Sequence, residues 1–183
     1  MKSVGEKQQP YRNLAFFADS MHGSLARKLR IFGIDTAYSS SISDEHLLKE
    51  CDEQGRILLT SDKELFRRSL NERIGSVLLN GHSDKENMIK LLGKYKIRKI
   101  QFDSAHARCP KCNIKLEEKM KDDIDDVNNS IPPKSLHYTN FYQCGRCRKM
   151  YWEGSHKPAL VSLAESVNQE LRRVSGFLEL AKV

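Results

Sequence analysis

Two pairs of cysteines constrain this chain more than any other feature of its sequence. Cys109 and Cys112 form one C-x-x-C pair, and Cys144 and Cys147 form a second. Four thiolates from two such pairs can occupy the corners of a tetrahedron, which is the ligand set of a structural Zn²⁺ site. The spacer at 113–143 is longer than in the commonest pattern, so we expect it to hold extra loop structure.

A disulfide framework is the alternative for these cysteines, and it is typical of secreted proteins. The first ten residues are polar and lack the apolar core of a signal peptide. We therefore expect a cytoplasmic chain whose paired thiols are reduced and bind Zn²⁺. The fifth cysteine, Cys51, follows Leu47 by one turn of a helical pattern, which predicts a small buried residue rather than a reactive thiol.

The net charge of +7 indicates a polyanionic partner, with nucleic acid as the first candidate. The alternative is that the charge serves solubility alone. Several basic residues are clustered, which favours nucleic acid: Arg27, Lys28 and Arg30, then Arg146, Arg148 and Lys149. No apolar run approaches the length of a membrane span, so no membrane partner is expected.

Short apolar segments alternate with helical patterns over the first half of the chain. We expect strands at 14–18, 36–38, 56–60 and 76–79, and helices at 24–32, 43–51, 61–70 and 84–92. This alternation predicts an α/β fold with a largely parallel sheet. In the first helix, Leu25, Ala26, Leu29 and Phe32 share one face, and Arg27, Lys28 and Arg30 are expected on the other.

A further amphipathic pattern runs from 158 to about 180. We expect this helix to pack on its own chain, and a partner-binding helix is the alternative.

Aspartates lie at or near the ends of the expected strands. Asp19 follows the first strand, Asp44 opens the helix after the second, Asp62 follows the third, and Asp84 comes shortly after the fourth. The carboxyl ends of parallel strands gather at one edge of a sheet. Carboxylates there suit Mg²⁺ or Mn²⁺, which can activate water for attack on a phosphodiester.

Helix capping is the alternative role for Asp44 and Asp62. Asp84 is the weakest member of the set, and Glu45 competes with Asp44 for its role. The acidic run at 122–126 is flanked by lysines and is expected to be a solvated loop. The sequence has no P-loop, G-x-G-x-x-G or G-x-S-x-G pattern, so nucleotide-dependent and serine-nucleophile chemistry has no support.

Several segments together resemble the Mut7-C RNase family. They are ADSMHGSLARKLR at 18–30, GIDT at 33–36 and GRILLTSD at 55–62. The later segments RCPKCN at 108–113, CGRC at 144–147 and YWEGSH at 151–156 match that family's zinc ribbon. The resemblance covers roughly 14–157. It implies a PIN-like α/β nuclease domain joined to a zinc ribbon, with a ribonuclease activity assigned mainly through the fold.

The resemblance also implies roles for individual residues. Asp19 and Asp62 carry over as metal-binding carboxylates, with Asp44 as the third and Asp84 in the region of a fourth. Two positions depart from the family pattern: Ser61 stands where a basic residue is usual, and Lys28 where an aromatic residue is common. The implied organisation is a flexible tail at 1–12, a PIN-like domain at 13–104, a zinc ribbon at 105–157 and a terminal helix at 158–183.

The first functional hypothesis is a metal-dependent endoribonuclease. Its RNA contacts would come from Arg27, Arg30, Arg146, Arg148, Lys149 and Trp152, with ribosomal RNA or tRNA as candidate targets. A zinc ribbon beside a PIN-like domain is similar in plan to the endonuclease that trims small-subunit ribosomal RNA. The alternatives are a non-catalytic RNA- or ribosome-binding protein and a protein-interaction adaptor that uses the terminal helix.

Four aromatic residues near the second cysteine pair have two possible roles. Phe141, Tyr142, Tyr151 and Trp152 can stack on unpaired bases, or they can form the core of a small module. We expect at least two of them in the core. His156 is not needed as a zinc ligand, because four thiolates complete a tetrahedron, and is expected to orient the module or contact RNA.

Overall fold

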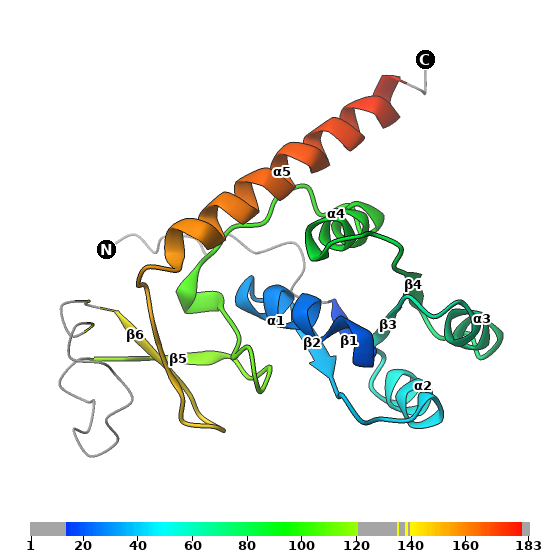
Figure 1. Ribbon diagram of the computed structural model, residues 1–183, viewed down its shortest axis with the longest axis horizontal. Helices are drawn as coiled ribbons and strands as arrows, with labels where there is room; N and C mark the ends of the chain where they lie inside the picture. The colour runs from blue at the N-terminus through cyan, green and yellow to red at the C-terminus, as the bar shows by residue number, and fades with distance from the viewer. Residues whose placement is uncertain (1–13, 121–134, 136–137, 139, 181–183) are drawn as a thin grey trace, which may run out of the picture.

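The computed structural model describes residues 14–120, 135, 138 and 140–180 of the 183-residue chain. The expected tail at 1–12 and the acidic run at 122–126 lie outside the described residues. The described part contains a four-stranded sheet, a three-stranded sheet and five α-helices (Figure 1).

The four-stranded sheet is parallel throughout and has the order β2-β1-β3-β4. Its strands are β1 (Ala15–Ala18), β2 (Asp35–Tyr38), β3 (Ile57–Thr60) and β4 (Ser76–Leu78). The helices that follow them are α1 (Gly23–Ile31), α2 (Asp44–Glu53), α3 (Lys63–Asn71) and α4 (Asp84–Lys94). The α/β fold with a parallel sheet that the sequence predicts is therefore confirmed.

Each face of this sheet is buried under helices, because successive side chains of a strand point to opposite faces. One cluster joins residues of α1, α4 and α5 to Phe16 and Leu59, while a second joins residues of α2 and α3 to Phe17 and Leu58. Cys51 lies in the second cluster at 1% exposure, and burial raises the pKa of its thiol to about 12. The expectation that this cysteine is a buried apolar residue is confirmed.

The long helix α5 (Lys157–Leu180) runs from the small sheet across α4 (Figure 1). Ala164, Val167 and Leu171 contribute to the core on this side of the sheet. The amide of Asn168 is buried and exchanges two hydrogen bonds of 2.8 Å with the backbone of Ile100. This part of α5 therefore packs on its own chain, as expected. No helix in the described part of the chain is long and apolar enough to cross a membrane.

The small sheet is antiparallel and has the order β5-β6-β7. Its strands are β5 (Leu116–Lys119), β6 (Phe141–Cys144) and β7 (Met150–Trp152). Phe141 and Met150 form its buried centre, with Tyr138 and Trp152 half-buried against them. Phe141 and Tyr142 are the two buried members of the aromatic set, which confirms that at least two of the four serve the core.

Arg30 joins the parallel sheet to the first cysteine turn. Its position differs from the polar face of α1 that the sequence predicts. The side chain is only 4% exposed. Its Nε donates to the carbonyl oxygen of Thr36 at 2.7 Å, and its Nη1 donates to the carbonyl oxygens of Pro110 at 2.7 Å and Lys111 at 3.2 Å. The first cysteine turn covers this side of α1, so Arg30 is buried there, whereas Arg27 is exposed.

Candidate functional site

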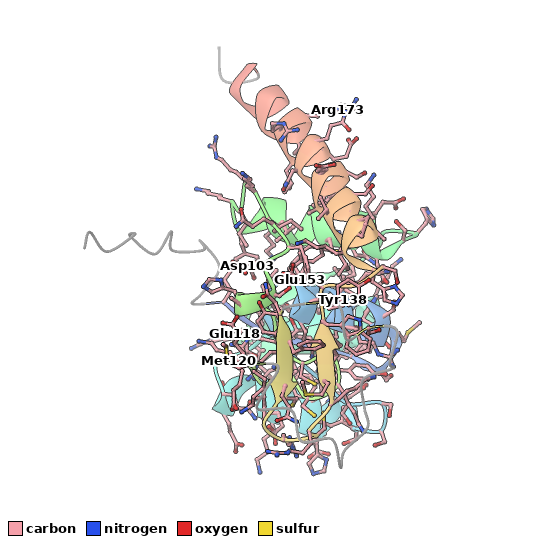
Figure 2. All side chains as sticks on the ribbon, turned by 90° about the vertical axis from the view of Figure 1, so that its left-hand side faces the viewer. Asp103, Glu118, Met120, Tyr138, Glu153 and Arg173 are labelled. Carbon is pink, nitrogen blue, oxygen red and sulfur yellow. The ribbon has the colours of Figure 1, made fainter. Side chains whose placement is uncertain are left out.

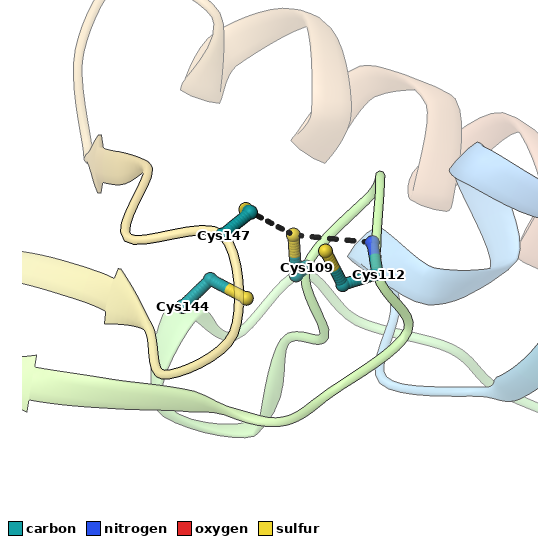
Figure 3. Close-up of side chains that lie close together, drawn as sticks. All are labelled: Cys109, Cys112, Cys144 and Cys147. Carbon is teal, nitrogen blue, oxygen red and sulfur yellow. Dashed lines mark hydrogen bonds between the residues drawn. The ribbon is translucent and has the colours of Figure 1, made fainter.

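The four cysteines of the two pairs come together where two turns face one another (Figure 3). Their sulfur atoms all lie within 4.8 Å of one another. The Sγ atoms of Cys109 and Cys147 are 3.7 Å apart. A tetrahedral Zn²⁺ site with Zn–S bonds of about 2.3 Å has sulfur–sulfur edges of about 3.8 Å. The donor set and the spacing fit Zn²⁺.

The two cysteine turns have the same backbone geometry. The N–H of Asn113 donates to the carbonyl of Cys109 at 2.8 Å, and the N–H of Arg148 donates to the carbonyl of Cys144 at 2.9 Å. Asn113 and Arg148 have φ angles of 65° and 58°, so each turn closes with a residue in the left-handed region. Both turns thus present their thiols inward in the same way, which prepares one shared site.

The thiols differ in acidity. Desolvation, together with the neighbouring Cys147 and Cys109, raises the pKa of Cys112 to about 12. The backbone N–H of Lys149 lowers the pKa of Cys147 to about 7. Zn²⁺ binds thiolates, so binding here is coupled to the release of protons. With Zn²⁺ bound, the four thiolates would leave no open position for a substrate, which is the arrangement of a structural site.

A second group of side chains lies at the carboxyl edge of the parallel sheet. Asp19 follows β1, is 5% exposed, and caps the short 3₁₀ helix η1 (Ser20–His22) through a 2.9 Å hydrogen bond from the N–H of Met21. Its other carboxylate oxygen accepts a hydrogen bond from the hydroxyl of Thr60, at the end of β3. The same hydroxyl oxygen accepts from the N–H of Asp62 at 2.9 Å. Thr60 therefore links the two aspartates.

Asp62 is the N-cap of α3. Its Oδ1 accepts from the N–H groups of Glu64 at 2.7 Å and Leu65 at 3.0 Å. The hydroxyl of Ser61 lies 2.6 Å from Nε2 of His22. A second side-chain bridge thus joins the segments that follow β1 and β3.

Asp44 and Asp84 lie at the first positions of their helices, but neither is the cap. Ser43 and Ser83 cap α2 and α4. The side chain of Asp44 is 56% exposed, with a carboxylate oxygen 3.8 Å from Nη1 of Arg68. Capping therefore accounts for Asp62 but not for Asp44.

Asp84 is bound by two side chains of α1. Its Oδ2 accepts from Nζ of Lys28 at 2.5 Å and from Oγ of Ser24 at 2.6 Å. Burial raises the pKa of Asp84, but the bonds from Lys28 and Ser24 and the nearby charges outweigh it, so the pKa lies below its ordinary value. Asp84 is therefore held in an ion pair with Lys28.

A compact metal site needs at least three ligand atoms that lie close together. In the described part of the chain, the four cysteines form such a group, with all sulfur atoms within 4.8 Å of one another, and the aspartates do not. Mg²⁺ keeps several waters and is commonly bound through one or two carboxylates. Asp19 and Asp62 offer two carboxylates at this edge, where Thr60 joins the carboxylate of Asp19 to the backbone of Asp62, and Asp62 is exposed.

The residues expected to contact RNA fall into three environments. Arg146, Arg148 and Lys149 are exposed around the second cysteine turn, and Arg27 is exposed on α1. Trp152 is half-buried in β7. Arg30 is occupied by backbone carbonyls beside the first cysteine turn, so it supports the cysteine site rather than an RNA surface.

A family model described as the Mut7-C RNAse domain matches residues 14–163. The chain belongs to this family. Searches among curated proteins and among solved structures found no match. The Mut7-C match spans both sheets and the first turns of α5, so it includes the strand-end aspartates and all four clustered cysteines.

Two residues of this site were not singled out from the sequence. Thr60, the last residue of β3, and His22, in the segment after β1, each contribute one of the two bridges. One signal for Thr60 was available in the sequence, because it is a polar residue that ends an apolar strand two positions before the candidate metal ligand Asp62. His22 had none, because its partner lies 39 residues away in the sequence.

Proposed function

We propose that this Mut7-C protein is a metal-dependent endoribonuclease with a PIN-like domain at 13–104 and a zinc ribbon at 105–157. The observation that carries the proposal is the buried Asp19, which Thr60 links to Asp62 at the carboxyl edge of the parallel sheet. Family membership supports a ribonuclease, and RNA is therefore the expected substrate.

Asp19 and Asp62 would hold Mg²⁺ or Mn²⁺, with Asp44 as a third carboxylate and Asp84 in the region of a fourth. The ion would supply an activated water and stabilise the charge that develops on the phosphoryl oxygens. Thr60 fixes the orientation of the Asp19 carboxylate, and the cap of α3 fixes that of Asp62. Residues held in this way lose little freedom when they bind an ion, which favours a well-defined site.

The cysteine cluster would hold structural Zn²⁺ and keep the second cysteine turn in place. Arg146, Arg148 and Lys149 are exposed on that turn and can bind RNA phosphates. Lys149 also lies over the ring of Tyr151, with Nζ 5.8 Å from the ring centre. The zinc site would thereby position a basic surface without taking part in the chemistry.

A cleavage assay tests this proposal. End-labelled single-stranded and structured RNAs are incubated with the zinc-loaded protein, with Mg²⁺, with Mn²⁺ or with neither ion. Internal cuts that require the added ion support an endonuclease. RNA binding without cleavage under every condition would instead support the alternative, a non-catalytic RNA- or ribosome-binding protein on the same fold.

A further inference from the structure

A cavity of about 510 Å³ lies where α1, the segment 102–110, the small sheet and the first turns of α5 meet. Its wall contains four aromatic side chains, which are Phe102, Tyr142, Tyr151 and Trp152. Pockets for small ligands commonly measure about 300–1,000 Å³ and are lined mainly by apolar and aromatic groups. The cavity therefore has the size and the lining of a binding site for a flat ring.

Two of the aromatic walls are fixed in place before any ligand binds. A Cβ atom on Gly154 would lie 2.8 Å from Nε1 of Trp152, so a glycine is needed for the chain to pass the indole this closely. The hydroxyl of Tyr151 lies 3.2 Å from Sγ of Cys109. Walls that are already ordered reduce the entropy cost of binding.

The charges around the cavity differ from side to side. Lys28, Arg108 and His156 line it, and the first two are held by ion pairs to Asp84 and Asp35. The charges of Glu118, Glu153 and Asp103 act on buried Tyr142, which also lines the cavity; all three acids are labelled in Figure 2. An anionic group is disfavoured beside Tyr142. A neutral ring inside and a phosphate near the basic side match this distribution.

One residue of the cavity wall, Lys28, also contacts an aspartate at the edge of the parallel sheet. Lys28 lines the cavity, and its Nζ is the group that binds Asp84 at 2.5 Å. Asp84 in turn accepts from Ser24, in the first turn of α1 next to His22. A single RNA strand lying along this side of α1 would therefore meet both sites.

We propose that this cavity receives one unpaired nucleobase of the RNA strand that is bound at Asp19 and Asp62. The inference rests on the proposed function, because it takes RNA as the substrate. The base stacks against the aromatic wall, and the adjoining phosphate lies on the side of Lys28 and His156. Stacking of one base on aromatic side chains changes affinity by about 5- to 150-fold.

Trp152 is the single tryptophan of the chain, so its fluorescence reports on the cavity directly. A short single-stranded RNA is titrated into the zinc-loaded protein without added Mg²⁺ or Mn²⁺, and Trp152 emission is followed together with the anisotropy of a labelled RNA. A set of RNAs that each lack one base shows which nucleotide occupies the cavity. The filling variant is Ala159→Phe, since Ala159 lines the cavity from the exposed start of α5.

The matched control is Val161→Phe, on the same helix at an exposed position that does not line the cavity. We expect RNA to quench Trp152 in the native protein, and one abasic position to weaken binding about tenfold. Ala159→Phe should abolish the quench and the sensitivity to that abasic position, whereas Val161→Phe should keep both. Ala159→Met provides a smaller filling group if the phenylalanine variant loses zinc.

An RNA that is bound or cleaved without a change in Trp152 emission would overturn the inference. So would an Ala159→Phe protein that keeps the native affinity and the native abasic profile. If RNA quenches Trp152 but is never cleaved, the proposed nuclease function would be contradicted, whereas binding of a base in the cavity would still be supported. Absence of any RNA binding would overturn both.

Discussion

The Nη1 group of Arg30 in α1 donates to the carbonyl oxygen of Pro110 in the first cysteine turn, at a distance of 2.7 Å. The guanidinium is buried, so its cost of desolvation is offset by the three carbonyl oxygens that it binds. Desolvation lowers the pKa of Arg30, while the nearby thiols of Cys109 and Cys112 act in the opposite direction. This contact ties the cysteine site to the parallel sheet.

Replacing Arg30 by methionine should therefore destabilise the protein. The change leaves buried carbonyl groups without a donor, and we expect a loss of about 3 kcal/mol in the free energy of unfolding. Arg27→Met is the control, because Arg27 is exposed on the same helix. Urea unfolding of the two variants measures the difference. Equal stability of both variants would contradict the structural role of Arg30.

Thr60 should control the proposed catalytic centre without being a metal ligand. Thr60→Val keeps the shape of the buried side chain but removes the hydroxyl that binds Asp19 and Asp62. We expect the rate of RNA cleavage to fall by about 10- to 100-fold, which is typical of groups that orient a metal ligand. Thr60→Ser keeps the hydroxyl and should retain most of the rate. A serine variant as slow as the valine variant would count against this role.

Zinc content tests the cysteine cluster. Cys109→Ser removes a ligand whose sulfur is 3.7 Å from that of Cys147. The native protein should bind about one zinc per chain. This variant should bind no zinc, and its unfolding should no longer be cooperative. Cys51→Ala is the matched control, because Cys51 is buried in the parallel-sheet domain. The zinc content of the freshly purified proteins is measured by metal analysis. A native protein without zinc would refute the assignment of the four cysteines as a zinc site.

Asp35 makes stability depend on pH. Burial raises its pKa, but hydrogen bonds from Arg56 and Asn113 and the charge of Arg108 outweigh it, so the pKa lies below the ordinary value of 3.8. The folded state therefore prefers the ionised form. The stabilisation is fully present above pH 3.8 and is lost as the pH falls through the lower pKa of the folded protein.

Asp35→Asn should lower the free energy of unfolding by about 2 kcal/mol near neutral pH, because two arginines lose a charged acceptor. The difference between the variant and the native protein should shrink as the solution is acidified below the ordinary pKa of aspartate. Denaturant unfolding over a series of pH values measures it. A difference that stays constant into strong acid would show that the charge of Asp35 does not contribute.

The regular elements of the parallel sheet could be predicted because their causes are local. Phe16 and Phe17 lie in an apolar run that ends at Asp19, and Leu58 and Leu59 lie in another that ends at Asp62. The cysteine cluster was also accessible, since the spacing of each pair is a local pattern. These features depend on residues that are close in the sequence.

The fate of individual polar side chains could not be predicted in this way. From the sequence, Arg30 is expected on a polar helix face, but in the structure it binds the carbonyl of Pro110, 80 residues later. The sequence likewise does not show that Lys28 of another helix binds Asp84. Ser61 gives no sign in the sequence that its hydroxyl lies within hydrogen-bonding distance of His22. Such outcomes depend on contacts between elements, which one sequence does not encode locally.

The most direct test of the proposed function is the rate of RNA cleavage by Asp19→Asn. The amide keeps the shape of the side chain but removes the charge that a divalent ion requires. We expect the zinc-loaded variant to cleave more than about 100-fold more slowly than the native protein in Mg²⁺ or Mn²⁺. Asp52→Asn, an exposed acid on α2, should cleave at the native rate. Equal rates for Asp19→Asn and the native protein, or no cleavage by the native protein, would contradict it.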